Sequence, residues 1–287
     1  MVPRDGAARP TRSIHVFRPG HIIFILISLV LITLGLFVVR RRKPTIEQLI
    51  RAFLPVAVAC EAIKLFLTIQ IVPLVDAVVV DGQLIYQETG AFSPYLESEH
   101  LPFELCSLQI IFMACTLLVR DPAWKRRLYS VIYGTALVGG LLALILSSIA
   151  PEFETTHAFL TSPRAWEFFI YHSMIIVLAL SIALDETCGL RFGDIRWVGC
   201  AIVVLDYISL YLNSMLSVPV YQEGEIKGLT YALNFLSSYD DPIGLTLSDK
   251  PRYLAYFAAR YLIGAVLLAL AYLPFLRRRP TTTSREG

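Results

Sequence analysis

The chain has 287 residues, of which 56% are hydrophobic and only 17% charged, and its mean hydropathy is +0.62. Soluble domains carry about 25% charged residues and shorter apolar runs, so an ordinary soluble enzyme is excluded. The formal net charge of +2 is too small to indicate nucleic acid as a partner. The sequence therefore predicts an integral membrane protein.

Apolar runs near the length that spans a bilayer as a helix, about 20 residues, occur along the whole chain. We count seven of them, at 21–39, 50–75, 101–119, 128–150, 165–184, 197–218 and 253–276. This pattern predicts an all-α, polytopic transmembrane helical bundle. We expect a flexible N-terminal tail over 1–20, a single transmembrane domain over 21–277 and a flexible C-terminal tail over 278–287. The first run is longer than a signal-peptide core and lacks a small-residue cleavage site, so it is expected to remain as an anchor.

The distribution of Lys and Arg predicts the orientation of the chain. Basic residues gather after the first, third, fifth and seventh runs, beginning with the Arg40–Lys43 cluster. Cytoplasmic loops carry such an excess, so we expect the N-terminus outside and the C-terminus inside. The four arginines that precede the first run favour the opposite orientation.

Five cysteines occur in the sequence: Cys60, Cys106, Cys115, Cys188 and Cys200. Their spacing matches no metal-binding pattern, and none falls in a predicted outer loop. We therefore expect no disulfide framework, no metal and no cofactor. No feature indicates a protein partner.

Polar and charged side chains interrupt several of the apolar runs. Such groups are costly within a bilayer, so each is expected to face the bundle and to have a partner. The set comprises Glu61, Lys64, Glu104, Cys106, Gln109, His172, Asp206, Asn213 and Arg260. Two structural explanations stay open, namely an i,i+3 contact between Glu61 and Lys64 and an ion pair between Asp206 and Arg260.

Four of these polar residues are predicted to share one depth. With a rise of about 1.5 Å per residue, Cys106, His172, Asn213 and Arg260 all lie roughly 7–11 Å below the outer boundary. If a helix begins at Leu101, the side chains of Cys106 and Gln109 also share one face. This coincidence of depth and phase favours a functional site over four unrelated packing residues.

The sixth run carries one polar stripe. Its members recur every three or four residues, so they share one face of a helix. They are Asp206, Ser209, Asn213 and Ser217. The stripe contrasts with an apolar face formed by Val203, Val204 and Leu205.

A thiol and an imidazole at the depth of glycerol esters indicate acyl chemistry. A thiolate attacks a carbonyl carbon when a base is nearby, and His172 is the one histidine deep enough in a run to serve Cys106. Gln109 or Asn213 is a candidate donor to an oxyanion, and Arg260 a candidate ligand of a phosphate headgroup. A lone intramembrane cysteine is, however, more often a small hydrophobic packing residue.

Three segments resemble a known family of membrane proteins. "HLPFELCSL" at 100–108 resembles the LPxHLC signature of the YwaF-like bacterial proteins and their eukaryotic relative, transmembrane protein 164. "WEFFIYHSMIIVLAL" at 166–180 resembles that family's aromatic-rich span with a central His, and "LYLNSMLSVPVY" at 210–221 is a looser match. The resemblance covers roughly 45–275.

The resemblance implies a cysteine-dependent phospholipid acyltransferase, with Cys106 as nucleophile and His172 as its base. The implied partners are membrane phospholipids and lysophospholipids, with an acyl-enzyme between them. Glu104 stands where the family commonly has His, so it must act as a carboxylate or the activity differs. We place Glu104, Gln109, Asp206, Asn213 and Arg260 in substrate-binding or supporting roles. The family's Asn-Tyr element after the sixth run is only partly matched here, because Tyr231 and Asn234 occur in the reverse order. The apolar run at 229–238 is too short to span a bilayer, so it could be a re-entrant segment.

Other functions stay open at this point. Transfer to water would make the protein a lipase. Alternatively, the intramembrane charges line the path of a small-molecule or ion transporter, or an outer aromatic pocket serves a ligand sensor. We expect an acyltransferase to tolerate loss of Lys64 and a transporter to require it. The membrane is the plasma membrane if the protein is bacterial, and the endoplasmic reticulum if it is eukaryotic.

Overall fold

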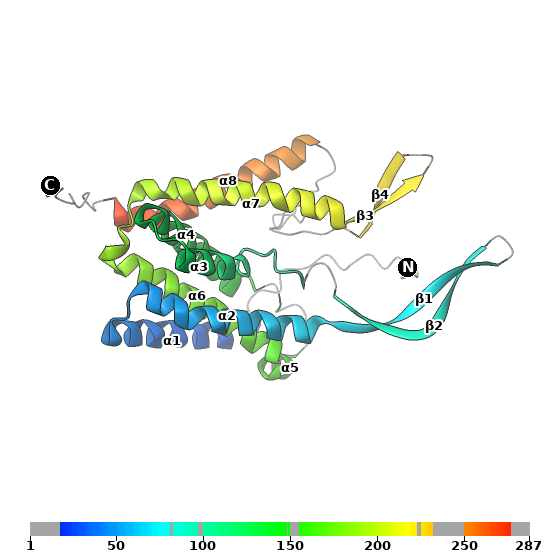
Figure 1. Ribbon diagram of the computed structural model, residues 1–287, viewed down its shortest axis with the longest axis horizontal. Helices are drawn as coiled ribbons and strands as arrows, with labels where there is room; N and C mark the ends of the chain where they lie inside the picture. The colour runs from blue at the N-terminus through cyan, green and yellow to red at the C-terminus, as the bar shows by residue number, and fades with distance from the viewer. Residues whose placement is uncertain are drawn as a thin grey trace.

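The computed structural model describes residues 18–80, 83–96, 100–147, 149, 155–222, 225–231 and 250–276. Helices dominate this part of the chain (Figure 1). They are α1 (Pro19–Arg42), α2 (Ile46–Thr68), α3 (Leu108–Leu118), α4 (Pro122–Ile145), α5 (Thr156–Thr161), α6 (Pro163–Leu184), α7 (Ile195–Leu216) and α8 (Lys250–Tyr272). Three 3₁₀ turns lie at Glu186–Cys188, Phe192–Asp194 and Leu273–Phe275.

Five described helices, α1, α4, α6, α7 and α8, are long and apolar enough to cross a membrane. The predicted helical membrane bundle is thus confirmed. Helix α2 has 23 residues but carries two acidic and two basic side chains, and α3 has only 11 residues. An α3 of that length is too short to cross a bilayer alone, since a span needs about 20 residues. The seven-span count and the orientation stay predictions.

The helix starts follow from capping residues in the sequence. At α2, the Thr45 hydroxyl accepts a hydrogen bond from the Gln48 amide, and the Gln48 side chain accepts one from the Thr45 amide. At α4 and α6, Asp121 and Ser162 cap the first turn, and each is followed by proline. Proline has no amide hydrogen to lose in the first turn, so these pairs start the helices at fixed positions.

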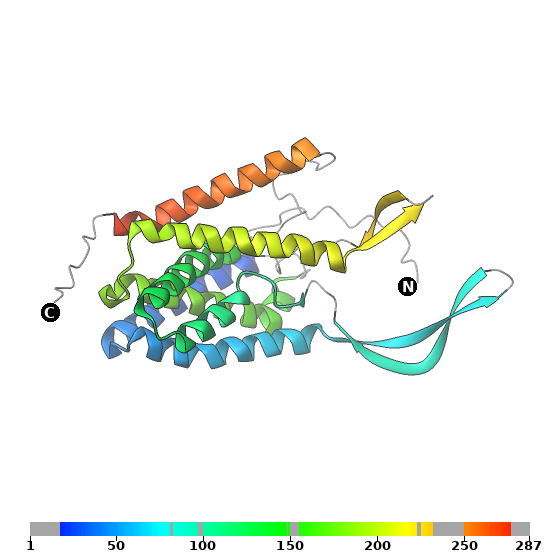
Figure 2. The same cartoon turned by 45° about the horizontal axis from the view of Figure 1, so that its top comes forward.

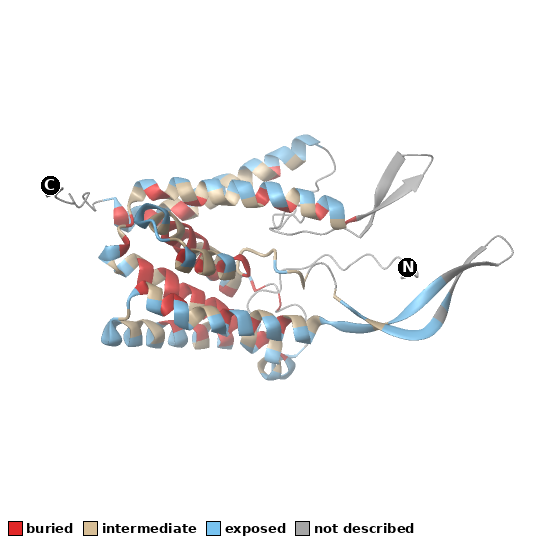
Figure 3. Cartoon of the chain, viewed as in Figure 1, coloured by how far each residue is buried: buried red, intermediate tan, exposed pale blue. Residues whose placement is uncertain are grey.

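Helices α4 and α6 form the centre of the bundle. They are the two most buried of the candidate spans, and the buried residues gather on them in Figure 3. Their close approach depends on Gly140, where a Cβ atom would lie 2.8 Å from Ile176 Cγ1 and 3.6 Å from the His172 carbonyl oxygen. Small residues allow membrane helices to approach closely, so Gly140 sets the packing around His172.

Helices α7 and α8 pack on α4 and carry apolar side chains outward. The predicted polar stripe of α7 is buried. By contrast, Val203 and Val204 on the opposite face are more than half exposed. This inside-out arrangement fits a helix whose apolar face contacts lipid and whose polar face contacts protein.

Two β-hairpins extend beyond the helices, which the sequence analysis did not predict. Antiparallel strands β1 (Gln70–Val80) and β2 (Gln83–Tyr95) form one, and β3 (Val218–Gln222) and β4 (Glu225–Tyr231) form the other. Both project from the same end of the bundle (Figure 2). The second predicted run, 50–75, therefore leaves the helical conformation after Thr68, where β-branched residues such as Ile71 and Val72 favour a strand.

Several predicted boundaries fall at or beyond the described ranges. Helix α1 begins at Pro19, so the predicted tail over 1–20 ends slightly earlier; residues 1–17 lie outside the described residues. Residues 278–287 and most of the 229–238 run also lie outside them. The first three residues of that run belong to β4, and they are therefore extended rather than helical.

The third predicted run begins differently from our expectation. Residues 100–107 form turns, and α3 starts at Leu108 rather than at Leu101. The Ser107 side chain is bonded to α2, as described below, and this tertiary contact fixes the turns in place of a continuous helix. The expected shared helical face of Cys106 and Gln109 is therefore wrong, because Cys106 is not in a helix.

Candidate active site

Cys106 lies in the turn segment 100–107, which joins the β1–β2 hairpin to α3. Its side chain is half-buried, and the backbone amide of Ser107 interacts with the thiol. The Cys106 carbonyl oxygen accepts a hydrogen bond of 2.5 Å from the Tyr171 hydroxyl and one of 3.1 Å from the Gln109 amide. The backbone of Cys106 is thus fixed from α6 and from the start of α3.

A hydrogen-bonded ion pair from α2 lies beside Cys106. Lys64 and Glu61 are paired one turn apart, as the sequence allowed. Lys64 Nζ donates to Ser107 Oγ at 3.3 Å, and that hydroxyl donates to Glu61 Oε2 at 2.9 Å. Lys64 is only 8% exposed, so its ammonium group is held inside the protein by these partners. We call Glu61, Lys64, Glu104, Cys106, Ser107 and Tyr171 the Cys106 cluster.

Glu104 faces the same cation. Its half-buried carboxyl group interacts with Lys64, and it also acts electrostatically on the Cys106 thiol. Arg260 is not part of this group, because it pairs with Asp206. Glu104 therefore belongs to the Cys106 cluster through Lys64.

His172 is buried on α6, directly after Tyr171. Its Nδ1 lies 2.7 Å from the Phe168 carbonyl oxygen. A carbonyl oxygen only accepts hydrogen bonds, so Nδ1 carries the proton and Nε2 has the free lone pair of a base. Within the described ranges no hydrogen bond joins His172 to Cys106. The connection runs through Tyr171, whose ring meets the His172 ring edge-on with centroids 5.5 Å apart.

Gln109 is bound to structural partners. Its Nε2 donates to the Leu105 carbonyl at 3.2 Å and to Thr135 Oγ1 at 2.8 Å, which ties α3 to α4. Thr135 in turn donates to the Val131 carbonyl, so the direction of the Gln109 bond is fixed. Both amide hydrogens are used, and Oε1 is an acceptor without a partner among the described residues. Gln109 therefore has no donor left for an oxyanion in this arrangement.

Asp206, Asn213 and Arg260 lie on the α7–α8 side of the bundle. Arg260 Nη2 and Asp206 Oδ2 are 2.6 Å apart, and the Tyr261 hydroxyl also bonds to Asp206. Asn213 is fully buried, and its backbone carbonyl accepts a hydrogen bond from the Ser217 hydroxyl. The predicted residues therefore form separate groups around Cys106 and His172, between α3 and α4, and between α7 and α8.

The sequence analysis missed two members of the site. Tyr171 precedes the predicted base, and Ser107 follows the predicted nucleophile, yet neither was given a role. Adjacency to a candidate residue was the only signal available for Ser107. For Tyr171, the hydroxyl group of a tyrosine within a membrane helix was an additional signal, since buried tyrosines usually bond through that group.

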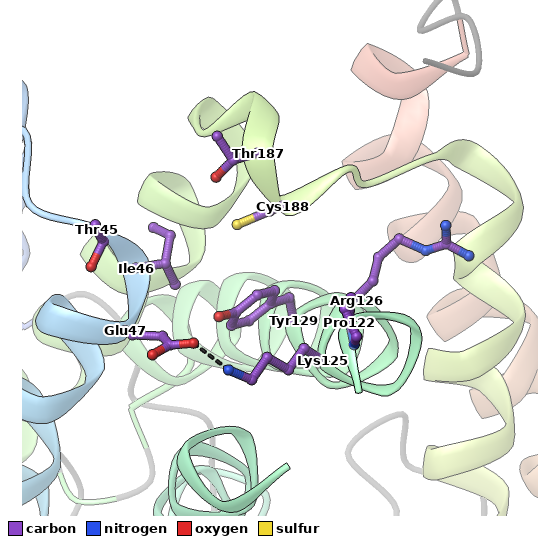
Figure 4. Close-up of a pocket in the computed structure, with 9 residues that line it drawn as sticks. All are labelled: Thr45, Ile46, Glu47, Pro122, Lys125, Arg126, Tyr129, Thr187 and Cys188. Carbon is purple, nitrogen blue, oxygen red and sulfur yellow. Dashed lines mark hydrogen bonds and ion pairs between the residues drawn. The ribbon is translucent and has the colours of Figure 1, made fainter. Parts of the chain in front are cut away.

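A pocket opens at the opposite end of α2. It has a volume of about 360 Å³ and is lined by Thr45, Ile46, Glu47, Pro122, Lys125, Arg126, Tyr129, Thr187 and Cys188 (Figure 4). Glu47 and Lys125 form an ion pair there. This hydrogen bond and the positive charge of Lys125 lower the pKa of Glu47 below its ordinary value. Lys64 lies about 26 Å away along the helix, so this pocket is separate from the Cys106 cluster.

A family model described as the TMEM164 family matches residues 16–276 of the chain. The match includes every described helix and the whole Cys106 cluster. No curated protein and no solved structure shows significant similarity to the chain. The chain belongs to the TMEM164 family, and the resemblance read from the Cys106 and His172 segments is confirmed.

Proposed function

We propose that this integral membrane protein of the TMEM164 family is a thiol-dependent phospholipid acyltransferase with Cys106 as its nucleophile. The observation that carries the proposal is the setting of Cys106. Its half-buried thiol lies in a turn outside regular helix, beside a buried ammonium group and tied to the histidine-bearing helix by Tyr171. A cysteine that only packs between helices needs none of these polar partners.

The first half-reaction forms a thioester. The Cys106 thiol gives its proton to His172, and the sulfur attacks the carbonyl carbon of a phospholipid acyl ester. The C–S bond forms as the ester C–O bond breaks. The departing lysophospholipid oxygen then takes the proton from His172.

The second half-reaction returns the enzyme to its starting state. The hydroxyl group of an acceptor lysophospholipid gives its proton to His172 and attacks the thioester carbon. The new ester C–O bond forms, the C–S bond breaks, and the proton returns from His172 to the Cys106 sulfur. With water as acceptor, the same steps hydrolyse the lipid, which is the lipase variant of this proposal.

The tautomer of His172 supports its role as base. Phe168 holds the proton on Nδ1, and the lone pair of Nε2 is therefore available to accept one. The nucleophile–base hydrogen bond is often loose in an enzyme without substrate and tightens when substrate binds.

A transport path is less well supported. The charges that were candidates for one belong to two ion pairs, Glu61–Lys64 within α2 and Asp206–Arg260 between α7 and α8. Each cation already has a carboxylate partner. The first pair also bonds to the residue next to Cys106, which favours a role in the acyl-transfer site.

The proposed site faces the outer side if the orientation predicted from the basic residues holds. It would then meet the outer leaflet of the plasma membrane in a bacterium, or the lumenal leaflet of the endoplasmic reticulum in a eukaryote.

The test uses the purified protein reconstituted in vesicles of phosphatidylcholine with an isotopically labelled acyl chain, with and without an unlabelled lysophospholipid. Lipid mass spectrometry follows the label. We expect labelled acyl chain on the added lysophospholipid, or as free fatty acid without it. Cys106→Ser should abolish both products, whereas the matched variant Cys115→Ser should retain them. Product formation unchanged in Cys106→Ser would contradict the proposal.

A further inference from the structure

We propose that Lys64 is a positioning residue for Cys106, and that its ammonium group stabilises the Cys106 thiolate while Glu61 and Ser107 hold it in place. The catalytic significance of this inference rests on the proposed function. The effect of Lys64 on the thiol does not, because it can be measured without any lipid substrate. The sequence analysis expected Lys64 to be dispensable for acyl transfer, and the structure leads to the opposite expectation.

Lys64 is fixed by two partners. It forms the ion pair with Glu61 on the preceding turn of α2, and its Nζ donates to Ser107 Oγ at 3.3 Å. The Ser107 hydroxyl closes the triangle by donating to Glu61 at 2.9 Å. Since Ser107 is covalently next to Cys106, these bonds set where the thiol lies relative to α2.

The opposite side of the turn is fixed independently. The Tyr171 hydroxyl donates to the Cys106 carbonyl oxygen at 2.5 Å. Cys106 is therefore held between α2, through Ser107, and α6, through Tyr171. A segment of irregular turns gains a defined position from these contacts, and a nucleophile must be held within a fraction of an ångström to react efficiently.

The burial of the Lys64 ammonium group is energetically unfavourable, so it is expected to serve a function. Removing an ammonium group from water costs several kcal/mol, even with a partner. Lys64 is 8% exposed, and an apolar residue of similar length would pack in its place at no such cost. Thiolates are stabilised by neighbouring cations, so charge stabilisation at Cys106 is a function that only the cation provides.

The other charged groups around the thiol act against Lys64 or are already neutralised. Burial of the Cys106 thiol opposes the formation of the thiolate most, Glu104 and Glu61 oppose it further, and Lys64 favours it. On α6, Glu167 pairs with Arg164 at 2.5 Å, so the charges of this pair largely cancel. The thiol of Cys60 on α2 is itself buried. Lys64 is therefore the cation that acts directly on Cys106.

The experiment measures how fast Cys106 reacts with a small neutral alkylating reagent, as a function of pH. Peptide mass spectrometry of the full-length protein in detergent assigns the modification to each cysteine. Four proteins are compared: the native chain, Lys64→Met, Lys64→Arg and Glu61→Gln. Cys115 in the same samples serves as an internal control, and size-exclusion chromatography with thermal unfolding verifies folding.

Removing a positive charge and removing a negative charge should shift the pH midpoint of Cys106 alkylation in opposite directions. Lys64→Met removes the cation, so the pH midpoint of Cys106 alkylation should rise by about one unit. Lys64→Arg keeps the charge and should restore most of the native midpoint. Glu61→Gln removes a negative charge, so the midpoint should fall. The Cys115 profile should stay unchanged in all variants.

A purely structural Lys64 would give a different pattern. An unchanged midpoint in folded Lys64→Met would overturn the inference, as would Lys64→Arg behaving like Lys64→Met. If Lys64→Met does not fold, Lys64→Gln decides in its place: it keeps a hydrogen-bond donor for Ser107 but carries no charge, so an unchanged midpoint there also overturns the inference. If the alkylation midpoints shift as expected but the protein transfers no acyl group, the effect of Lys64 on the thiol stands and only the proposed function is rejected.

Discussion

Two ion pairs within the membrane bundle contact different parts of the protein. Glu61 and Lys64 are one turn apart on α2, and a serine hydroxyl links them to the segment that carries Cys106. Asp206 and Arg260 come from two helices, α7 and α8, whose outward faces are apolar. The second pair fastens two helices together, whereas the first binds a segment of irregular turns. Two similar charge pairs in one sequence therefore have different roles, and only their third partners distinguish them.

The sharpest contrast between the two sides of the bundle concerns His172. His172→Ala removes the proposed base, so the rate of acyl transfer should fall by roughly 10²–10⁴-fold. The labelled-lipid assay measures this loss, with His157→Ala on the short helix α5 as the matched control. A His172→Ala protein that is folded and transfers at the native rate would remove His172 from the mechanism.

The α7–α8 pair should respond in stability rather than in rate. Asp206→Asn leaves Arg260 without its carboxylate, and unpairing a buried charge costs about 3–5 kcal/mol. Arg260 keeps 21% of its side chain exposed, so we expect a loss nearer 2 kcal/mol. Thermal unfolding in detergent measures the change, and the transfer rate per folded molecule should stay near the native value.

The double variant Asp206→Asn with Arg260→Met provides the control for that prediction. It removes both charges together, so much of the stability should return. If Asp206→Asn instead abolished transfer in a folded protein, the two ion pairs would belong to one functional unit and the comparison would fail.

Tyr171 should have a smaller effect on the Cys106 side. Tyr171→Phe keeps the ring against His172 but removes the hydrogen bond to the Cys106 carbonyl, which is worth about 1 kcal/mol. We expect the transfer rate to fall by roughly fivefold, with the same loss in kcat at saturating lipid. Tyr207→Phe, on the exposed face of α7, is the matched control and should leave the rate unchanged.

The smallest expected effect lies at the far end of α2. The folded-state pKa of Glu47 is lowered by Lys125, so its contribution to stability is present above the unfolded pKa and is lost as the pH falls through the folded value. Glu47 is 37% exposed, and we therefore expect only about 0.5 kcal/mol. Unfolding midpoints at neutral and acidic pH should converge for native protein and Glu47→Gln as the pH falls below about 4. An equal gap at both pH values would contradict this assignment.

The sequence predicted the parts of the fold that depend on local pattern. Apolar runs predicted the helices, and the polar stripe of α7 correctly indicated its buried face. The caps at Thr45 and Asp121, which set the starts of α2 and α4, were not predicted. The Glu61–Lys64 contact also follows from i,i+3 spacing alone. These features require no knowledge of which helices are neighbours.

The turn segment around Cys106 and the grouping of the site residues depended on tertiary contacts, which the pattern of apolar residues in the sequence does not reveal. Pro102 and Glu104 interrupt the apolar pattern of 101–107, but nothing local signals that Ser107 bonds to α2. Equal depth suggested that Cys106, Asn213 and Arg260 share a site, but depth does not specify which helices lie side by side. The structure places Arg260 against α7, and it places Lys64 and Tyr171 around Cys106.

The central claim, that Cys106 carries the acyl group, is tested most directly by intact-mass spectrometry. The purified protein is incubated with a phospholipid of defined acyl composition, without acceptor, beside Cys106→Ser and Cys115→Ser. The account predicts one added acyl mass on the native chain and on Cys115→Ser, released by hydroxylamine and absent from Cys106→Ser. The same adduct on Cys106→Ser, or lipid turnover that persists in that variant, would contradict it.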